Sequence, residues 1–428
     1  MRLNWFSPLP PARTDIAGFT ARLLPALCRR AEVVLWTDQD EWDPALAAYG
    51  PVRRFDPATV DWAEVQRGDV SVYNIANNPR FHAAAWQVSR QHPGLVILHD
   101  LSLQHLFAGI HGDDFDGYAA VMGRAYGSAG RWAAEAWWAE RLSVEFLGTY
   151  FPLTGLALEG ALGVVVHSRA LFESLRRAGR QPALHAELIY PVTPNRPPAE
   201  RPPGPPYHLI VFGYIGPNRR LASLLEALAN SPRRDEFRLD VYGQVWDPDH
   251  VQGLIAAYGL QGQVNLHGFV PDAELERALA SAHLAVNLRF PTMGEASGSQ
   301  LHIWDHALPS LVSRVGWYAD LPSEAVAFVR PEREVEDIAA LLEDFAARPG
   351  HYAAMGRNGR RILEERHTPA AYADRLLALA GEARRLRARA EATHTVRRAG
   401  ELLADWVAPY AAQEVYERVA RAVHDLAA

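Results

Sequence analysis

A proline-rich stretch near the middle of the chain constrains the fold more than any other feature of the sequence. Residues 190–208 read YPVTPNRPPAERPPGPPYH. Such a density of proline excludes both a helix and a central strand, because proline lacks a backbone N–H and has a fixed φ. We therefore expect an extended, semi-rigid connector over residues 191–207, which divides the 428-residue chain into two domains.

The same alternation of short apolar runs with helical stretches occurs on both sides of this connector. The runs lie at residues 33–36, 70–73, 95–98 and 163–166 in the first half, and at residues 208–212, 239–242, 264–266, 284–287 and 310–312 in the second. This alternation is typical of parallel sheets covered by helices on both faces. The sequence thus predicts an α/β fold with two Rossmann-like domains, residues 1–190 and 208–400. Ligands of such sheets bind beyond the carboxyl ends of the strands, so we expect the active site in the cleft where the two sheets face each other.

The composition excludes several classes of function. All 43 basic residues are arginine, which removes the P-loop lysine, the pyridoxal phosphate Schiff base and a lysine general base. A net charge of −7 argues against a general nucleic-acid binder. The single cysteine, Cys28, permits neither an intrachain disulfide nor a cysteine-rich zinc site. Since neither a signal-peptide core nor a run of 18 apolar residues is evident, we expect a cytoplasmic protein.

Residues 288–322, LRFPTMGEASGSQLHIWDHALPSLVSRVGWYADLP, combine an acidic residue, a turn of small residues and a helix start. Glu295 follows Gly294 and precedes the small residues 297–299, where a helix is predicted to begin. The free N–H groups of a helix start can bind an anion such as a diphosphate. A carboxylate beside that anion can accept hydrogen bonds from sugar hydroxyls.

This segment resembles the donor-site signature of the retaining glycosyltransferases of family 4, which have the two-domain GT-B fold. The resemblance implies that Glu295 contacts hydroxyls of the transferred sugar. It also implies that the small-residue turn supplies backbone amides to the sugar and the phosphates, from Gly294, Ser297, Gly298 and Ser299. The family's second glutamate holds the nucleotide ribose, and His302 takes its place here, counted back from Pro309.

The resemblance also assigns polar residues at other strand ends. It implies that His99 approaches the far hydroxyls of the donor sugar and that Asp100 orients it; the alternative is that Asp100 caps a helix beside a partly buried His99. Arg219 takes the position of a basic residue that pairs with the diphosphate, and Arg220 is the reserve candidate. A second basic residue, found after the glycine of this loop in many relatives, is replaced by Tyr214.

Backbone groups of further loops are expected to complete the site. Gly243, Phe269 and Val270 lie in loops that hold the nucleoside in relatives, and the nucleobase cannot be deduced from them. Near the N-terminus, the segment Asp15, Ile16 and Ala17 resembles the loop that lines the acceptor side, although Asp15 is better suited to cap the helix. Residues 101–152 are expected to build the acceptor surface, and the helix at 401–428 to pack back on the first domain.

These features predict transfer of a hexose-type sugar from a nucleoside diphosphate to an acceptor hydroxyl, with retention at the anomeric carbon. The resemblance implies no cofactor and no metal, since GT-B enzymes generally need neither. Another sugar, a lipid-linked glycan reached by peripheral membrane contact, a peptide and a metabolite all remain open as acceptors, as does the oligomeric state. One alternative is a catalytically weak GT-B protein that binds a nucleotide sugar or supports a partner transferase. A second alternative is an epimerase or a dehydrogenase. Such enzymes carry a glycine fingerprint after the first strand, whereas residues 6–10 of this chain read FSPLP there.

Overall fold

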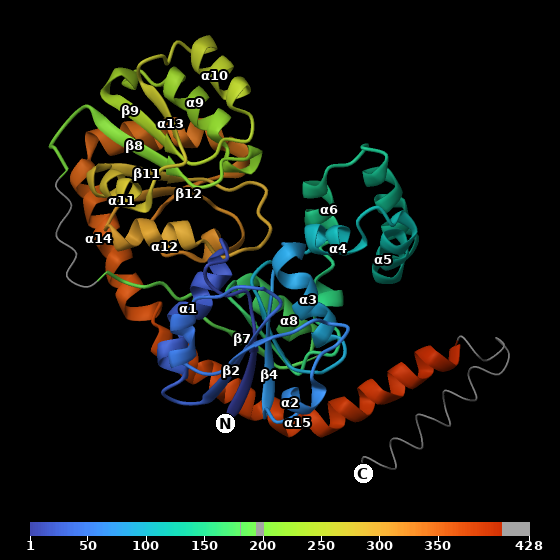
Figure 1. Ribbon diagram of the computed structural model, residues 1–428. Helices are drawn as coiled ribbons and strands as arrows, with labels where there is room; N and C mark the ends of the chain where they lie inside the picture. The colour runs from blue at the N-terminus through green and yellow to red at the C-terminus, as the bar shows by residue number, and fades with distance from the viewer. Residues whose placement is uncertain (180, 194–200, 405–428) are drawn as a thin grey trace. The chain divides into compact units, whose positions relative to one another are not determined.

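A computed structural model describes residues 1–179, 181–193 and 201–404 of the chain (Figure 1). Its internal contacts divide the protein into two compact units. Unit 1 consists of residues 1–186 together with the chain from Pro369 onward, and unit 2 of residues 187–368. The observed division therefore falls after residue 186, whereas the sequence analysis placed the end of the first domain at residue 190.

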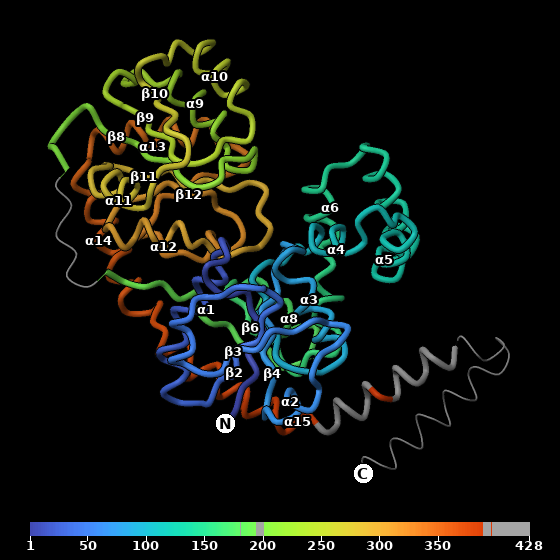
Figure 2. The backbone as a smooth tube through the Cα atoms, viewed as in Figure 1, coloured from blue at the N-terminus to red at the C-terminus, as the bar shows by residue number. Residues whose placement is uncertain are grey.

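Unit 1 is built on a seven-stranded parallel sheet with the strand order β3-β2-β1-β4-β5-β6-β7 (Figure 2). Its strands are β1 (Arg2–Phe6), β2 (Glu32–Thr37), β3 (Val52–Arg54), β4 (Val70–Ile75), β5 (Leu95–Leu98), β6 (Gly163–Val166) and β7 (Ala183–His185). The central strands β4, β5 and β6 are buried along their whole length, as expected where helices cover both faces of a parallel sheet. The order of the strands reverses between β1 and β4, so the loops after these two strands open a crevice suited to ligands.

The helices of unit 1 connect these strands, and one returns from the far end of the chain. They are α1 (Asp15–Leu27), α2 (Trp62–Val65), α3 (Pro79–Ser89), α4 (Gln104–His111), α5 (Phe115–Trp138), α6 (Val144–Tyr150), α7 (Thr154–Ala157), α8 (Arg169–Ala178) and α15 (Pro369–Ala404), with a 3-10 turn η1 (Pro44–Ala48). Helices α4 to α6 form an excursion between β5 and β6 that stands away from the sheet (Figure 1).

Helix α15 packs on unit 1 through an apolar stripe. Its side chains Leu376 and Leu379 are buried, and Arg387 donates a hydrogen bond to the backbone oxygen of Gly68. A helix thus does return to the first domain, but it begins at Pro369 rather than at residue 401. Most of the segment expected to make this contact, residues 405–428, lies outside the described part of the chain.

Unit 2 is built on a six-stranded parallel sheet with the order β10-β9-β8-β11-β12-β13. Its strands are β8 (Tyr207–Phe212), β9 (Phe237–Tyr242), β10 (Val264–Gly268), β11 (Leu284–Asn287), β12 (Ser310–Ser313) and β13 (Ala327–Val329). Its helices are α9 (Leu221–Asn230), α10 (Pro248–Ala257), α11 (Asp272–Ser281), α12 (Gly298–Asp305), α13 (Glu334–Ala347) and α14 (Pro349–Arg366), with 3-10 turns η2 (Pro217–Arg219), η3 (Arg234–Glu236), η4 (Gly316–Asp320) and η5 (Pro331–Arg333).

The two parallel sheets confirm the predicted α/β fold with two Rossmann-like domains. All nine apolar runs identified in the sequence lie within strands of these sheets. The described parts of the proline-rich connector, residues 190–193 and 201–206, contain neither helix nor strand. In this connector Thr193 donates two hydrogen bonds to the carboxylate of Asp305 at the end of α12, which fastens it to unit 2.

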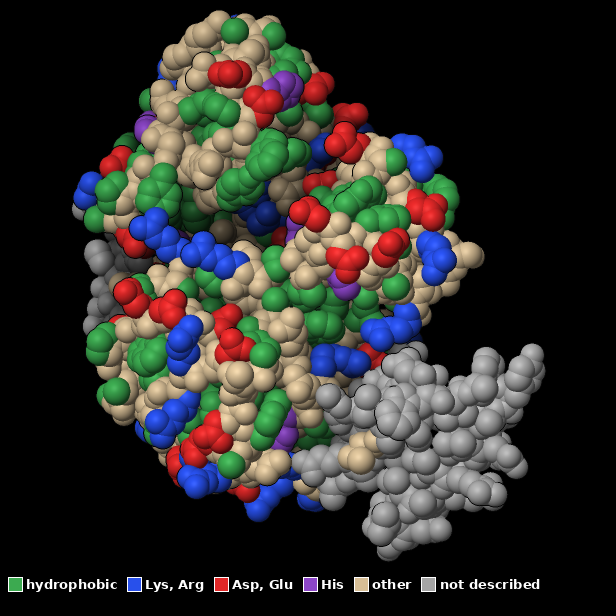
Figure 3. Space-filling view, turned by 45° about the vertical axis from the view of Figure 1, so that its right-hand side comes forward, with side chains coloured by type: hydrophobic (Ala, Val, Ile, Leu, Met, Phe, Trp, Pro, Cys, Tyr) green, Lys and Arg blue, Asp and Glu red, His purple; other side chains and the backbone are tan. Residues whose placement is uncertain are grey.

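Charged side chains of both signs are mixed on the face of the protein visible in Figure 3, where acidic groups lie among basic ones. Of the helices in the described residues, none combines the length and the apolar character needed to span a bilayer.

Candidate functional site

Several of the sequence-predicted donor residues lie in the loops at one place in unit 2, where the order of its strands reverses. Strand β8 pairs with β9 on one side and with β11 on the other. The loops after β8 and β11 therefore leave the sheet next to each other, and open α/β sheets bind ligands at such a point. A hydrogen bond of 2.8 Å from the backbone N–H of Phe290 to the oxygen of Asn218 joins the two loops.

Three glycines fix the loops that follow β8, β9 and β10. The N–H of Gly213 donates to the oxygen of Tyr242, and the N–H of Gly243 donates to the oxygen of Gly268. Gly243 has φ of +118°, and a Cβ atom there would lie 1.9 Å from the oxygen of Gly213. Only glycine fits this position, because both the backbone angle and the contact exclude a side chain.

Arg219 is a buried cation in this site. Its residue is 5% exposed, Nη1 donates to Asn287 Oδ1 at 2.9 Å, and Nη2 donates to the oxygen of Phe212 at 2.6 Å. Within the described residues its Nε has no hydrogen-bond partner and no carboxylate forms an ion pair with it. Burial, together with the nearby charge of Arg289, lowers the pKa of Arg219 to about 10, so the guanidinium remains charged at neutral pH.

Glu295 lies in the loop after β11 with its carboxylate held from three sides. Oε1 lies 3.1 Å from Arg289 Nε, while Oε2 accepts hydrogen bonds from the hydroxyl of Thr292 at 3.0 Å and the N–H of Met293 at 2.8 Å. Gly294 has φ of +80°, which lets the chain turn tightly around this carboxylate. The side chain of Glu295 remains partly exposed, so its remaining lone pairs can accept hydrogen bonds from a ligand.

Helix α12 begins at Gly298, as the small-residue turn predicts. Ser297 is its N-cap, and the hydroxyl of Ser297 accepts a hydrogen bond from the N–H of Gln300. Asn287, at the end of β11, donates a hydrogen bond to Gln300 Oε1 and accepts one from Arg219. It therefore links the start of α12 to Arg219. The backbone N–H groups of the first turn, which include Gly298 and Ser299, are thereby oriented next to a buried cation.

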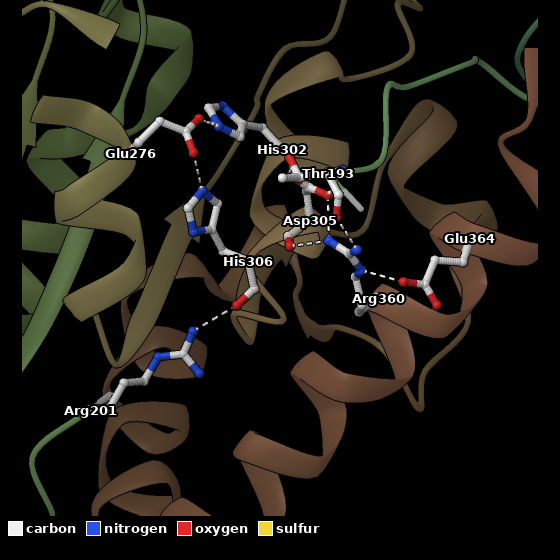
Figure 4. Close-up of polar contacts among 8 residues, drawn as sticks. All are labelled: Thr193, Arg201, Glu276, His302, Asp305, His306, Arg360 and Glu364. Carbon is white, nitrogen blue, oxygen red and sulfur yellow. Dashed lines mark hydrogen bonds and ion pairs between the residues drawn. The ribbon is translucent and has the colours of Figure 1, made fainter. Parts of the chain in front are cut away.

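Other predicted donor residues lie apart from this group. Arg220, with φ of +57°, points to Glu334 at the start of α13 and forms an ion pair of 2.7 Å with it. The ring of Phe269 is 83% exposed and Val270 is partly buried, so any role of this loop falls to its backbone. His302 turns toward α11, where its Nε2 lies 2.6 Å from Glu276 Oε1 (Figure 4). The ring of Phe212 stands edge-on to the ring of His302.

In unit 1, His99 and Asp100 follow β5 as predicted. His99 Nε2 lies 3.0 Å from Asn74 Oδ1, and Asn74 Nδ2 donates to the oxygen of Phe6. This orientation of the amide makes Nε2 the protonated nitrogen of His99 and leaves Nδ1 as an acceptor. Burial, with contributions from His167 and His82, holds the pKa of His99 well below its ordinary value, so the ring is neutral.

The helix-cap alternatives for the two aspartates are wrong. Asp100 accepts a hydrogen bond from the N–H of Asn77 at 2.8 Å and thus holds a loop, whereas α4 begins only at Gln104, without a side-chain cap. Helix α1 is capped by the hydroxyl of Thr14, and Asp15 is its exposed first residue. The predicted cap of α1, Asp15, lies one residue later in the sequence than the observed cap, Thr14.

The acceptor-side segment offers mainly its backbone. The side chains of Ile16 and Ala17 are buried in the core of unit 1, so they cannot contact a ligand directly. One turn further along α1, the ring of Phe19 packs edge-on against His99 with ring centroids 5.1 Å apart. Helix α1 therefore packs against the ring of His99 through Phe19. Of the three predicted residues, only Asp15 has a side chain exposed to solvent.

Sequence reasoning missed Arg289, Asn287 and Glu276. Arg289 lies two residues past β11 and pairs with Glu295, six positions later in the sequence, and no local pattern predicts this pairing. Asn287 is the polar last residue of an otherwise apolar strand, and such strand ends are the signal used for His99. No sequence pattern marks Glu276 as a site residue. It lies in α11, which follows β10, and only tertiary packing brings it to His302 in α12.

Comparison with known proteins agrees with this geometry. Residues 193–362 match the sequence model of the family glycosyl transferases group 1. This part of the chain is a glycosyltransferase domain. The matched residues include the loops after β8 and β11 and the start of α12, so the enzyme class is assigned on the half of the protein that contains Arg219 and Glu295. No curated protein matches the chain by sequence.

Solved structures share the fold over most of the chain. Anabaena Alr3699/HepE in complex with UDP and glucose has a TM-score of 0.56 at 14% identity, covering 88% of this chain and 98% of that one. Sucrose-phosphate synthase from Thermosynechococcus elongatus has a TM-score of 0.57 at 18% identity, covering 89% and 98%. A glycosyltransferase from Rickettsia africae ESF-5 has a TM-score of 0.60 at 10% identity, also covering 89% and 98%. The glycosyltransferase therefore has the GT-B fold.

Proposed function

We propose that this glycosyltransferase moves a hexose-type sugar from a nucleoside diphosphate to an acceptor hydroxyl, with retention at the anomeric carbon. The observation that carries the proposal is the local charge at the reversal point of the unit 2 sheet. Arg219 is buried, and its side-chain hydrogen bonds go to the neutral acceptors Asn287 and Phe212. Burial and the nearby charge of Arg289 lower its pKa. A buried cation of this kind suits an anionic ligand such as a diphosphate.

The proposed roles in the donor half follow from the contacts. Arg219 and the N–H groups of the first turn of α12 bind the diphosphate, which leaves with additional negative charge. Glu295 accepts hydrogen bonds from sugar hydroxyls, and its fixed position orients the anomeric carbon. Arg289 is placed to supply the second cation that Tyr214 cannot supply, since it lies close enough to lower the pKa of Arg219.

The nucleoside is assigned to the loops beside α12. His302 is the proposed ribose contact, with its ring orientation held by Glu276 and by the ring of Phe212. The backbone around Phe269 is the proposed base contact, and the loop of Gly243 supports it through the hydrogen bond to Gly268. Backbone contacts alone do not identify the base.

Unit 1 is proposed to bind the acceptor and the far side of the donor sugar. Neutral His99 can accept a hydrogen bond from a sugar hydroxyl through Nδ1, because Nε2 is held by Asn74. Asp100 keeps the loop in place, and Asp15 is the exposed carboxylate of the acceptor side. The excursion of α4 to α6 carries exposed aromatic side chains suited to an acceptor surface, Trp132, Trp138, Phe146 and Tyr150.

The proposed mechanism is front-face substitution. Its leaving diphosphate takes the proton of the acceptor hydroxyl while Arg219 and the helix N–H groups stabilise the developing charge. No step is assigned to a metal ion or to an organic cofactor. Two structures of similar fold, one a complex with UDP and glucose and one a sucrose-phosphate synthase, support a nucleotide-sugar donor. We expect a cytoplasmic enzyme whose acceptor is a glycan, a lipid-linked glycan, a peptide or a metabolite.

A second candidate, a weakly active nucleotide-sugar binder or partner subunit, is favoured by two departures from the family pattern. Tyr214 is 54% exposed and offers no charge, and His302 stands in place of a glutamate. Nucleotide-sugar binding by purified protein, without donor hydrolysis or transfer to a broad acceptor panel, would support this candidate.

The test begins with a thermal-shift screen of nucleoside diphosphates and their sugars, since a specific ligand raises the unfolding midpoint. Turnover is then compared in wild type, Glu295→Gln and the control Glu324→Gln, which changes an exposed glutamate of the same unit. We expect Glu295→Gln to lower transfer by about 10²-fold or more with nearly unchanged affinity for the diphosphate, because the lost contact is to the sugar. Equal turnover in all three proteins would exclude Glu295 from the site.

A further inference from the structure

Two histidines and a glutamate converge between α11 and α12 (Figure 4). His302 and His306 are four residues apart, so their rings leave α12 on the same side, with centroids 5.4 Å apart. Glu276 reaches across from α11 and places Oε1 2.6 Å from His302 Nε2 and Oε2 3.0 Å from His306 Nε2. Both imidazoles thus present the same nitrogen to one carboxylate.

This arrangement has the chemistry of a metal-ligand set. The three ligand atoms lie within 4.8 Å of one another, and zinc–nitrogen and zinc–oxygen bonds of about 2.0–2.2 Å put neighbouring tetrahedral ligands roughly 3.3 Å apart. Small rotations of the Glu276 side chain therefore suffice to admit an ion. Imidazole and carboxylate are ligands of zinc-class ions, and three protein ligands leave a position for water.

The surroundings of the cluster hold the two helices in place and leave one side open. The side chain of His306 is 1% exposed and that of His302 is 19% exposed, whereas Glu276 is 40% exposed and provides the entry route. Arg201 donates to the backbone oxygen of Ala282 at the end of α11 and to that of His306 at the end of α12. The separation of the helices at the cluster is therefore fixed by contacts that do not use the ligand atoms.

We propose that Glu276, His302 and His306 bind a divalent ion of the zinc class, with water completing its coordination. Among residues 1–179, 181–193 and 201–404, this is the one group of three histidine, cysteine, aspartate or glutamate side chains found with converging ligand atoms. The ion joins α11 to α12, the helix whose first turn carries the proposed diphosphate contact. It is a structural ion in this proposal, because the phosphate charge is met by Arg219 and not by this cluster.

The decisive variant is Glu276→Gln, because glutamine keeps the size and hydrogen bonding of the side chain but is a poor metal ligand. Glu274→Gln is the matched control, since it removes a carboxylate from the same helix two residues away. His302→Gln, at a partly exposed position, removes a second ligand independently. Circular dichroism melts establish that each untagged, chelator-treated protein is folded before titration.

Co²⁺ and Zn²⁺ serve as the probes. Wild type and Glu274→Gln are expected to take up one equivalent of Co²⁺ with visible absorption bands that Zn²⁺ abolishes, while Glu276→Gln and His302→Gln bind about 100-fold more weakly or worse. This readout is independent of sugar transfer. The proposal would be overturned if wild type took up no stoichiometric Co²⁺, or if both ligand variants bound Co²⁺ as wild type does. The cluster would then serve only to join the two helices by hydrogen bonds.

Discussion

At the scale of single residues, the least ordinary group in the protein is the guanidinium of Arg219. It is buried against the neutral acceptors Asn287 and Phe212, and its neighbour Arg289 adds a second positive charge. A buried charge whose direct hydrogen-bond partners are neutral is unfavourable, because neutral hydrogen bonds replace hydration only in part. A bound diphosphate would remove that penalty, which explains why a site for the ligand can lie around an otherwise destabilising residue.

Arg219→Gln should therefore weaken binding of a nucleoside diphosphate by about 1.5–3 kcal/mol, the range for hydrogen bonds to charged groups, and affect nucleoside binding far less. Calorimetric titration measures both affinities. Arg220→Gln is the neighbouring control, and it should lower stability instead, because it leaves the buried carboxylate of Glu334 without its ion pair. The reverse pattern would move the diphosphate contact to Arg220.

At the scale of elements, the loops after β8, β9 and β10 act as one unit because hydrogen bonds link them in sequence. Gly213 is bonded to the end of β9, and Gly243 to the end of β10. The tight contact at Gly243 brings the first two loops together at the edge of the proposed nucleoside site. Displacement of one loop should therefore displace its neighbours.

Gly243→Ala tests this coupling. We expect it to destabilise unit 2 by about 3 kcal/mol or more, since a Cβ atom meets backbone and the angle is strained. Gly259→Ala is the control: Gly259 also has positive φ, of +64°, but open space around it, so roughly 1–2 kcal/mol is expected. Denaturant titrations give both values, and equal losses would mean that the loops are not packed as described.

At the scale of the whole molecule, the chain crosses from unit 2 back to unit 1 at α15. Unit 1 thus needs both ends of the sequence, because Leu376 and Leu379 fill its core more than 200 residues after Gly163, which packs against Leu379. An ion pair between Arg30 and Asp374 also links α15 to the N-terminal part of unit 1. Unit 2 is continuous in sequence and has its own buried core.

The two units should accordingly respond to different core mutations. Leu376→Ala removes a buried side chain of α15 and should cost unit 1 about 2–5 kcal/mol, whereas Leu342→Ala, in α13, should cost unit 2 a similar amount. Scanning calorimetry with and without a nucleoside diphosphate distinguishes the transitions, because the ligand should raise that of unit 2. A ligand-responsive transition lowered by Leu376→Ala would contradict this division.

Much of the architecture and part of the candidate site could be predicted from the sequence. The buried strands are continuous apolar runs, so their period and length are visible without a structure. Strands β3, β7 and β13 were not predicted because each has only three residues and lies at the edge of a sheet, too short for a pattern. The helix start at Gly298 was predicted since capping chemistry is local, although the same reasoning failed for Asp15, where Thr14 is the cap.

The sequence by itself determined the two parallel α/β domains, the turn of small residues before α12, and the positions of Arg219, His99 and Glu295 in segments that follow strands. These features depend on neighbours along the chain, whose chemistry can be read directly. Only the tertiary structure decided that Arg289 pairs with Glu295, that Arg220 turns away to Glu334, and that Glu276 meets His302 and His306. Such contacts depend on which strands lie adjacent and how helices are rotated, and no local pattern records either.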